Sequence, residues 1–126
     1  MKTVIHTPTA PAAIGPYSQA IIANGFLYTS GQIALDPDSG ELVMDTIEME
    51  CHQVMKNLRE VLSAADMKFE NVVKTTIYLS SMSLYSDVNL VYSEYFDSDP
   101  PAREAVQVAG LPKGVNIEIS VVAYKD

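Results

Sequence analysis

The chain has 126 residues, of which 48% are hydrophobic, and this length suits a single globular domain over residues 1–126. Sixteen acidic residues against eight basic residues give a net charge of −8, which would repel phosphate backbones, so the sequence argues against a nucleic-acid partner. It contains neither a secretory leader nor an apolar run of about 18 residues, so we expect no membrane partner and a cytoplasmic location.

Cysteine and histidine are too scarce to build a metal centre. The single cysteine, Cys51, cannot form a disulfide within the chain, and it falls in an apolar helical stripe, where we expect a small buried side chain. With only His6 and His52 as imidazoles, the sequence offers no zinc-type cluster, and we expect no metal site.

The first part of the chain predicts short β-strands. They are expected at residues 2–5, 18–22 and 26–30. Asn24-Gly25, between the second and third of these, is a strong hairpin signal because both positions of a type I′ turn need positive φ. Gly31 then follows, either in a bulge or at a point where another group comes close to the backbone.

A proline-rich segment and a turn cluster separate these strands from each other and from the rest of the chain. Residues 6–17 contain three prolines and predict an extended loop, which ends in a rigid corner that places Tyr17 at the start of a strand. A tyrosine there belongs either to the core or to a site. Residues 36–41, with Asp-Pro and Ser-Gly pairs, predict a turn.

Two stretches predict helices. Asp45 with Glu48 has the spacing of a capping box, and the apolar residues that follow repeat at three and four up to Ala65, which predicts a helix that covers a sheet. Residues 83–96 predict a second helix with Ser83 as its cap and Asn89 on its flank, a position that suits surface decoration.

The remaining apolar runs predict three more strands. Residues 72–80 are rich in β-branched side chains and predict a central strand. The runs 102–108 and 117–122, joined by a Leu-Pro-Lys-Gly turn, are interpreted as a hairpin. If their apolar rows face the core, Arg103 and Glu118 lie together on the opposite face of the sheet. They form there either an ordinary ion pair or a substrate site, in which arginine binds a carboxylate and glutamate deprotonates water.

This order of elements predicts an α+β sandwich, a mixed sheet with two helices on one face. The other face would then be bare, yet its residues include few charges. Because a water-facing sheet surface is usually polar throughout, we infer that another chain buries it.

Five stretches, in this order and spacing, resemble the RidA family of reactive intermediate deaminases, also known by the name YjgF. They are APAAIGPYSQA at 10–20, TSGQI at 29–33, VVKTTIYL at 72–79, VNLVY at 88–92, and PAR with LPKGVNIEI across 101–119. The resemblance covers nearly the whole chain.

The resemblance implies a chorismate-mutase-like sandwich that assembles as a homotrimer with intersubunit clefts. It also implies hydrolysis of 2-imino acids, such as 2-iminobutanoate and 2-iminopropanoate, and of their enamine tautomers, to 2-oxo acids and ammonia. No cofactor or metal takes part in that reaction.

Carried over by position, Arg103 resembles the arginine that binds the substrate carboxylate, and Glu118 the acid that activates water. The substrate-binding positions are Tyr17, Ser30, Gly31, Asn89, Arg103 and Ala105. A nearby Arg103 would lower the pKa of Glu118.

Three positions depart from the family pattern. Glu104 and Ala105 stand where many members have a small residue and then a cysteine, and Pro100 stands where a phenylalanine is often found. Strand parity places Glu104 on the core side, and we expect it to reach water at the edge of the strand.

Three other functions remain open. The first is a non-catalytic trimeric binding module for small carboxylates, acting as a sensor or chaperone-like regulator. The second is a ribonuclease or translation inhibitor, which the net charge of −8 disfavours. The third is a deaminase that has shifted to another imine or enamine, for which the Glu104-Ala105 pair is the evidence.

Overall fold

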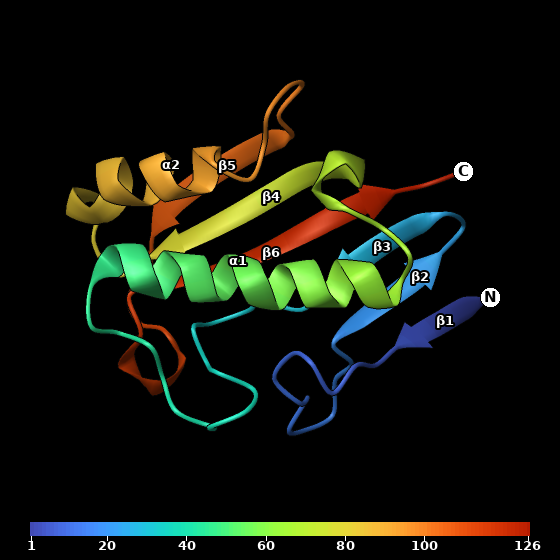
Figure 1. Cartoon of the computed structure of the whole chain (residues 1–126), viewed down its shortest axis with the longest axis horizontal. Coiled ribbons are helices and arrows are strands. Elements are labelled where there is room, and N and C mark those ends of the chain that lie inside the picture. Colours follow the sequence, from blue (N-terminus) through green and yellow to red (C-terminus); the bar gives the residue numbers. More distant parts are fainter.

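Six strands form one sheet, and two helices cover one of its faces (Figure 1). The computed structural model describes residues 1–126. The strands are β1 (Lys2–Ile5), β2 (Ala20–Ala23), β3 (Phe26–Thr29), β4 (Val72–Leu79), β5 (Ala102–Gln107) and β6 (Ile117–Tyr124). The helices are α1 (Ile47–Ala64) and α2 (Tyr85–Ser93), with 3₁₀ turns at Phe69–Asn71, Met82–Leu84 and Pro112–Gly114.

The spatial order of the strands is β1-β2-β3-β6-β4-β5. Neighbouring strands are antiparallel, except that β4 and β5 run parallel. The predicted α+β class, a mixed sheet with both helices on one face, is therefore confirmed. The core lies between that face and the helices, and none of the helices is long and apolar enough to cross a membrane.

The predicted hairpin at Asn24-Gly25 is present. Asn24 has φ of 53° and Gly25 has φ of 84°, and β2 and β3 pair antiparallel on either side of them. The turn at residues 36–41 is also present, since the Gly40 amide donates to the Asp36 carbonyl at 2.9 Å.

Helix α1 begins one residue later than predicted. Thr46, not Asp45, is the N-cap: its backbone is extended, and its side chain accepts a hydrogen bond from the Met49 amide at 3.1 Å. The apolar stripe faces the sheet as expected. Cys51 is fully buried in it, and burial is the main cause that raises the pKa of its thiol to about 12, so it is a packed side chain rather than a nucleophile.

Helix α2 is shorter than the predicted 83–96. It is preceded by the turn Met82–Leu84, and Ser81 caps that turn by accepting from the Ser83 amide at 3.2 Å. The prediction of Ser83 as the cap was wrong because the chain is already helical at that residue.

The last two strands do not form a hairpin, which corrects the prediction. β4 lies between them: α2 carries the chain over to β5, which runs parallel to β4, and β6 returns to lie between β3 and β4. Each alternate residue of β6 from Ile117 to Ala123 is buried, which suits the interior of the sheet. β5 carries Arg103, Glu104 and Gln107 and forms the edge.

This topology reverses the predicted faces of β5. Arg103 is opposite Thr75 and Ala105 is opposite Ile77, and both β4 partners are buried under the helices. Since paired residues point to one face, Arg103 and Ala105 face the helices. The prediction assigned the alanine and valine row of β5 to the core, but an edge strand need not bury its more apolar row.

Glu104 lies on the face without helices, not on the core side. It is exposed, as expected, where Lys74 Nζ approaches its carboxylate at 3.1 Å and the Thr76 hydroxyl donates to it at 2.7 Å. The same face carries exposed Tyr28 and Val106, which are 49% and 42% exposed. Apolar side chains are therefore left uncovered there by this chain.

Candidate active site

Arg103 is held in place by α2. Its Nη1 donates to Asn89 Oδ1 at 2.8 Å and its Nη2 to the Tyr85 hydroxyl at 2.6 Å. Its Cζ lies 4.9 Å from the centre of the Tyr92 ring. A half-buried guanidinium fixed by two hydrogen bonds and a stacked ring keeps N–H groups free for a planar anion.

A hollow of about 440 Å³ lies beside this arginine. It is lined by Asn89, Tyr92, Ser93, Phe96, Pro100, Pro101 and Arg103. Asn89 is therefore part of the arginine site, as the family resemblance implied. It is not the surface decoration that its position on the helix flank suited. Pro100 stands in the wall of this hollow.

Glu118 borders a second hollow, of about 330 Å³, on the helix-free side of the sheet. Its polar lining residues are Tyr17, Gln19, Gln32, Lys113 and Glu118, with Gly31 beside them. Its apolar wall is formed by Pro11, Ala12, Ile14, Ile33, Leu35 and Pro112.

Gly31 leaves room for the Glu118 carboxylate. A Cβ atom at residue 31 would overlap Glu118 Oε2 and lie 2.7 Å from Glu118 Cδ. This approach is fixed by the next residue, because the Gln32 amide donates to the Ile119 carbonyl at 2.8 Å and the Ile119 amide donates back at 3.1 Å. Of the two interpretations of Gly31, close approach of another group is confirmed.

The Glu118 carboxylate has no hydrogen-bond or ion-pair partner in the chain, and it is half-buried. Burial raises its pKa above the ordinary value of 4.5. The prediction that Arg103 lowers this pKa was wrong for the single chain, because Arg103 faces the opposite side of the sheet. A carboxylate with a raised pKa is a stronger base, which suits proton abstraction from water.

The other predicted site residues differ in whether they line a hollow. Tyr17 is 54% exposed and lines the Glu118 hollow. Ser30 lines neither hollow; its hydroxyl donates to the Ser18 carbonyl at 2.6 Å and so fixes the segment that carries Tyr17. Ala105 packs against the core on the arginine side and lines neither hollow.

Within one chain, the two parts of the candidate site are separate. Arg103 is level with Thr75 and Glu118 with Tyr78, so they differ by three residues along β4 and lie on the strands at its two sides. That is about 10 Å along the sheet and about 10 Å across it, in addition to the difference in face. We call them the Arg103 half-site and the Glu118 half-site.

Sequence reasoning missed several residues of both half-sites. Tyr85 and Tyr92 hold the arginine, and their spacing of four and three from Asn89 was a signal that these side chains share one flank of a helix. Gln32 and Lys113 in the Glu118 half-site come from loops, where no such periodicity exists.

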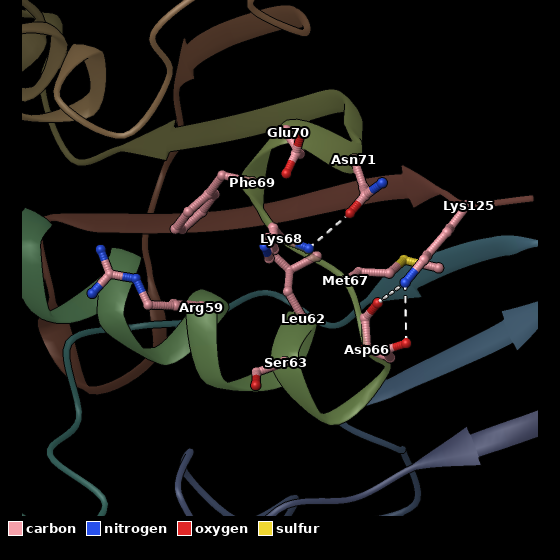
Figure 2. Close-up of a pocket in the computed structure, with 10 residues that line it drawn as sticks. All are labelled: Arg59, Leu62, Ser63, Asp66, Met67, Lys68, Phe69, Glu70, Asn71 and Lys125. Carbon is pink, nitrogen blue, oxygen red and sulfur yellow. Dashed lines mark hydrogen bonds and ion pairs between the residues drawn. The ribbon is translucent and has the colours of Figure 1, made fainter.

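The largest hollow of the chain lies elsewhere and contains none of the predicted residues (Figure 2). It measures about 840 Å³ and lies where α1 ends and the turn Phe69–Asn71 begins. Lys125 Nζ crosses it to Asp66, with contacts of 2.7 Å to the carbonyl and 3.0 Å to the carboxylate. No three His, Cys, Asp or Glu side chains anywhere in the chain come together as a metal site.

Comparison with known proteins finds one matching protein family and similar proteins from several organisms. Residues 7–125 match the Endoribonuclease L-PSP family. The human enzyme named 2-iminobutanoate/2-iminopropanoate deaminase is 50% identical over 125 residues, covering 99% of this chain and 91% of that protein. A RutC family protein of Pyrococcus horikoshii is 48% identical over 126 residues, covering 100% of both chains.

A solved structure has the same fold. It is a protein of unknown function from Yersinia pestis, YyfA, of the conserved Rid protein family. It superposes with a TM-score of 0.97 at 48% identity, covering 99% of this chain and 100% of that one.

Proposed function

The chain belongs to the Endoribonuclease L-PSP family, also called the YjgF/RidA family, and we propose that it hydrolyses reactive 2-imino acids and their enamine tautomers to 2-oxo acids and ammonia. The named activity of the human relative, 50% identical over nearly the whole chain, supports this reaction and suggests 2-iminobutanoate and 2-iminopropanoate as substrates. The reaction we propose uses no cofactor, and we expect it in the cytoplasm.

One observation carries the proposal. The chain presents a fixed guanidinium with free N–H groups in one half-site and a half-buried, unpartnered carboxylate in the other. An imino acid requires these two groups, a fork for its carboxylate and a base for the water that attacks its C2 carbon.

The protein is proposed to be a homotrimer whose clefts join the two half-sites. Each Arg103 half-site would meet the Glu118 half-site of a neighbouring copy, since the two halves of one chain face opposite ways. The uncovered apolar side chains of the sheet, among them Tyr28 and Val106, support the burial of this face against other copies. Cyclic symmetry then gives three equivalent sites.

The chemistry follows from these positions. Arg103 binds the substrate carboxylate through two parallel hydrogen bonds and so orients C2. Glu118 takes a proton from water as the water oxygen bonds to C2 of the protonated imine, and the C=N electron pair moves to nitrogen to give a carbinolamine. The protonated Glu118 returns that proton to the amine nitrogen. Glu118 then takes the hydroxyl proton as the C=O bond forms and the C–N bond breaks, so that the 2-oxo acid and ammonia are released, and ammonia carries the last proton away as ammonium. General-base help of this kind contributes about 10² to 10⁴ in rate.

No step requires a thiol. Ala105 replaces the cysteine of many family members, and it packs against the core behind Arg103. The deaminase activity is therefore expected to survive this replacement, with a changed preference among imine side chains.

The test is the decay of 2-iminobutanoate, generated in place by a threonine dehydratase and trapped competitively by semicarbazide. Wild type should speed the formation of 2-oxobutanoate, Arg103→Ala should abolish this effect, and Glu118→Ala should lower the rate by about 10² or more. A folded, trimeric wild type that leaves semicarbazide trapping unchanged would overturn the proposal for this substrate.

A second candidate function is capture of a small carboxylate without turnover. It is favoured by the Arg103 half-site, whose hydrogen bonds are complete within one chain. Titration with 2-oxobutanoate separates the two functions: a binding module would show the same affinity with Glu118→Ala and no acceleration of imine decay. The net charge of −8 disfavours RNA as the substrate, despite the family description.

A further inference from the structure

We infer that Glu50, a buried carboxylate of α1, is a positioning residue that sets the location of Glu118 by holding Asn116. This inference rests on the proposed role of Glu118 as the base. Glu50 lies outside both hollows and forms no hydrogen bond with Arg103 or Glu118, so its influence would pass through the start of β6.

Glu50 has no solvent exposure and no cationic partner. Both of its oxygens are used by one residue, since the Asn116 amide donates to Oε2 at 2.8 Å and Asn116 Nδ2 donates to Oε1 at 2.9 Å. A buried carboxylate that relies on neutral donors alone is costly compared with an apolar side chain, and such exceptions concentrate at functional sites.

The contact replaces a ladder hydrogen bond at the end of β6. Glu118 is opposite Tyr78, so Asn116 is opposite Ser80, and a regular antiparallel pair would exchange two amide hydrogen bonds. Only one forms, from the Ser80 amide to the Asn116 carbonyl at 2.9 Å. The Asn116 amide turns to Glu50 instead, so α1 fixes where β6 starts.

This fixed point is next to the Glu118 half-site. Asn116 is two residues before Glu118, and the turn that precedes it supplies Pro112 and Lys113 to the lining of the hollow. Figure 1 shows this turn beside the first residues of α1. Within the turn, the Gly114 amide donates to the Leu111 carbonyl and the Val115 amide to the Pro112 carbonyl, each at 3.2 Å. The Glu50 hydrogen bonds tie Asn116, just after the turn, to α1.

The first experiment compares Glu50→Gln with Glu48→Gln. Both substitutions remove one negative charge from the first turn of α1, but Glu48 is exposed. A glutamine at residue 50 would place its side-chain NH₂ group against one of the two N–H donors of Asn116, so one of the two hydrogen bonds would be lost. We expect Glu50→Gln to lower kcat about 10- to 100-fold with KM within about twofold, and Glu48→Gln to change neither.

A second comparison separates positioning from a general structural role. In a Glu118→Ala background, Glu50→Gln should lower the rate no further, because its effect passes through the missing carboxylate. A further loss of similar size in that background would overturn the inference.

A third measurement does not depend on activity. The carboxyl titration of Glu118, followed by ¹³C NMR and assigned with Glu118→Gln, should shift in Glu50→Gln and stay unchanged in Glu48→Gln. An inactive wild type would defeat the proposed function, whereas an unchanged Glu118 titration in Glu50→Gln would defeat the positioning role. The two failures are therefore distinguishable.

A rescue variant covers the case in which Glu50→Gln does not fold. Glu50→Gln with Asn116→Asp exchanges donor and acceptor: the glutamine oxygen accepts from the residue 116 amide, and its nitrogen donates to the new carboxylate. Net charge is kept. We expect kcat within about threefold of wild type and a restored Glu118 titration. A folded double variant that stays as slow as Glu118→Ala would contradict the inference.

Discussion

At the scale of single residues, the role proposed for Arg103 depends on its shape as well as its charge. Its two hydrogen bonds to α2 and its place over the Tyr92 ring both use the planar guanidinium. Arg103→Lys keeps the charge but loses the fork, so we expect kcat/KM to fall about 10- to 100-fold, while Lys56→Arg on the outer face of α1 serves as a neutral control. Progress curves with 2-iminobutanoate measure this, and an equal rate would refute the bidentate role.

Gly31 matters because the Glu118 carboxylate lies against it. Gly31→Ala would push the Glu118 carboxylate out of place, since its Cβ would overlap Oε2. We expect kcat to fall at least about tenfold with the fold retained. Gly110→Ala is the matched control, because no atom lies within 4 Å of the position of its Cβ. Equal kinetics in the two variants would show that the close approach has no catalytic consequence.

The raised pKa of Glu118 predicts an acid limb in the pH profile. A general base is active when deprotonated, so the rate should fall as pH falls through the Glu118 pKa, which burial places above 4.5. We expect kcat/KM, corrected for spontaneous decay, to show this midpoint in wild type and to lose it in Glu118→Ala. An acid limb that is unchanged in Glu118→Ala would contradict Glu118 as the base.

At the scale of elements, the N-cap of α1 offers a direct test of the corrected boundary. Thr46→Ala removes the acceptor for the Met49 amide, and we expect a loss of about 1 kcal/mol in the free energy of unfolding. Asp45→Ala should cost less than about 0.5 kcal/mol, since it retains only a dipole interaction. Urea unfolding at one fixed protein concentration measures both, and the reverse order would restore Asp45 as the cap.

Local signals in the sequence identified the elements well, because each depends on neighbouring residues. Asn24-Gly25 specifies its hairpin by the φ angles it adopts, and the stripe that includes Cys51 specifies the buried face of α1. The neighbour of each strand was not encoded locally. β5 pairs with β4 and not with β6 because the sheet as a whole assigns the more apolar strand to its interior.

The same limit affected the candidate site. Parity identified Arg103 and Glu118 as the two charges of interest and placed Glu118 on the correct, helix-free face, but the face of Arg103 depended on the pairing of β5 with β4. Positions taken from the family resemblance did not need that information: Tyr17, Gly31 and Asn89 line the half-sites, whereas Ser30 and Ala105 line neither hollow.

At the scale of the whole molecule, opposite-facing half-sites predict that inactive variants complement each other. In a trimer, each cleft would take Arg103 from one copy and Glu118 from the next. When Arg103→Ala and Glu118→Ala subunits are mixed equally and exchanged, about one quarter of the clefts receive both intact residues, because each copy is chosen independently. The mixture should therefore show about one quarter of wild-type activity, although each variant alone is nearly inactive.

Two controls make this result specific to the interface. Before the subunits exchange, the mixture should show no more than the summed activity of the two variants. Native mass spectrometry of tagged copies reports whether exchange has occurred. A doubly substituted chain mixed with either single variant should also give none, since no cleft can then combine both residues. Activity that stays at the sum of the parts after complete exchange would mean that one chain must supply both residues, which the register of β5 and β6 on β4 forbids without rearrangement.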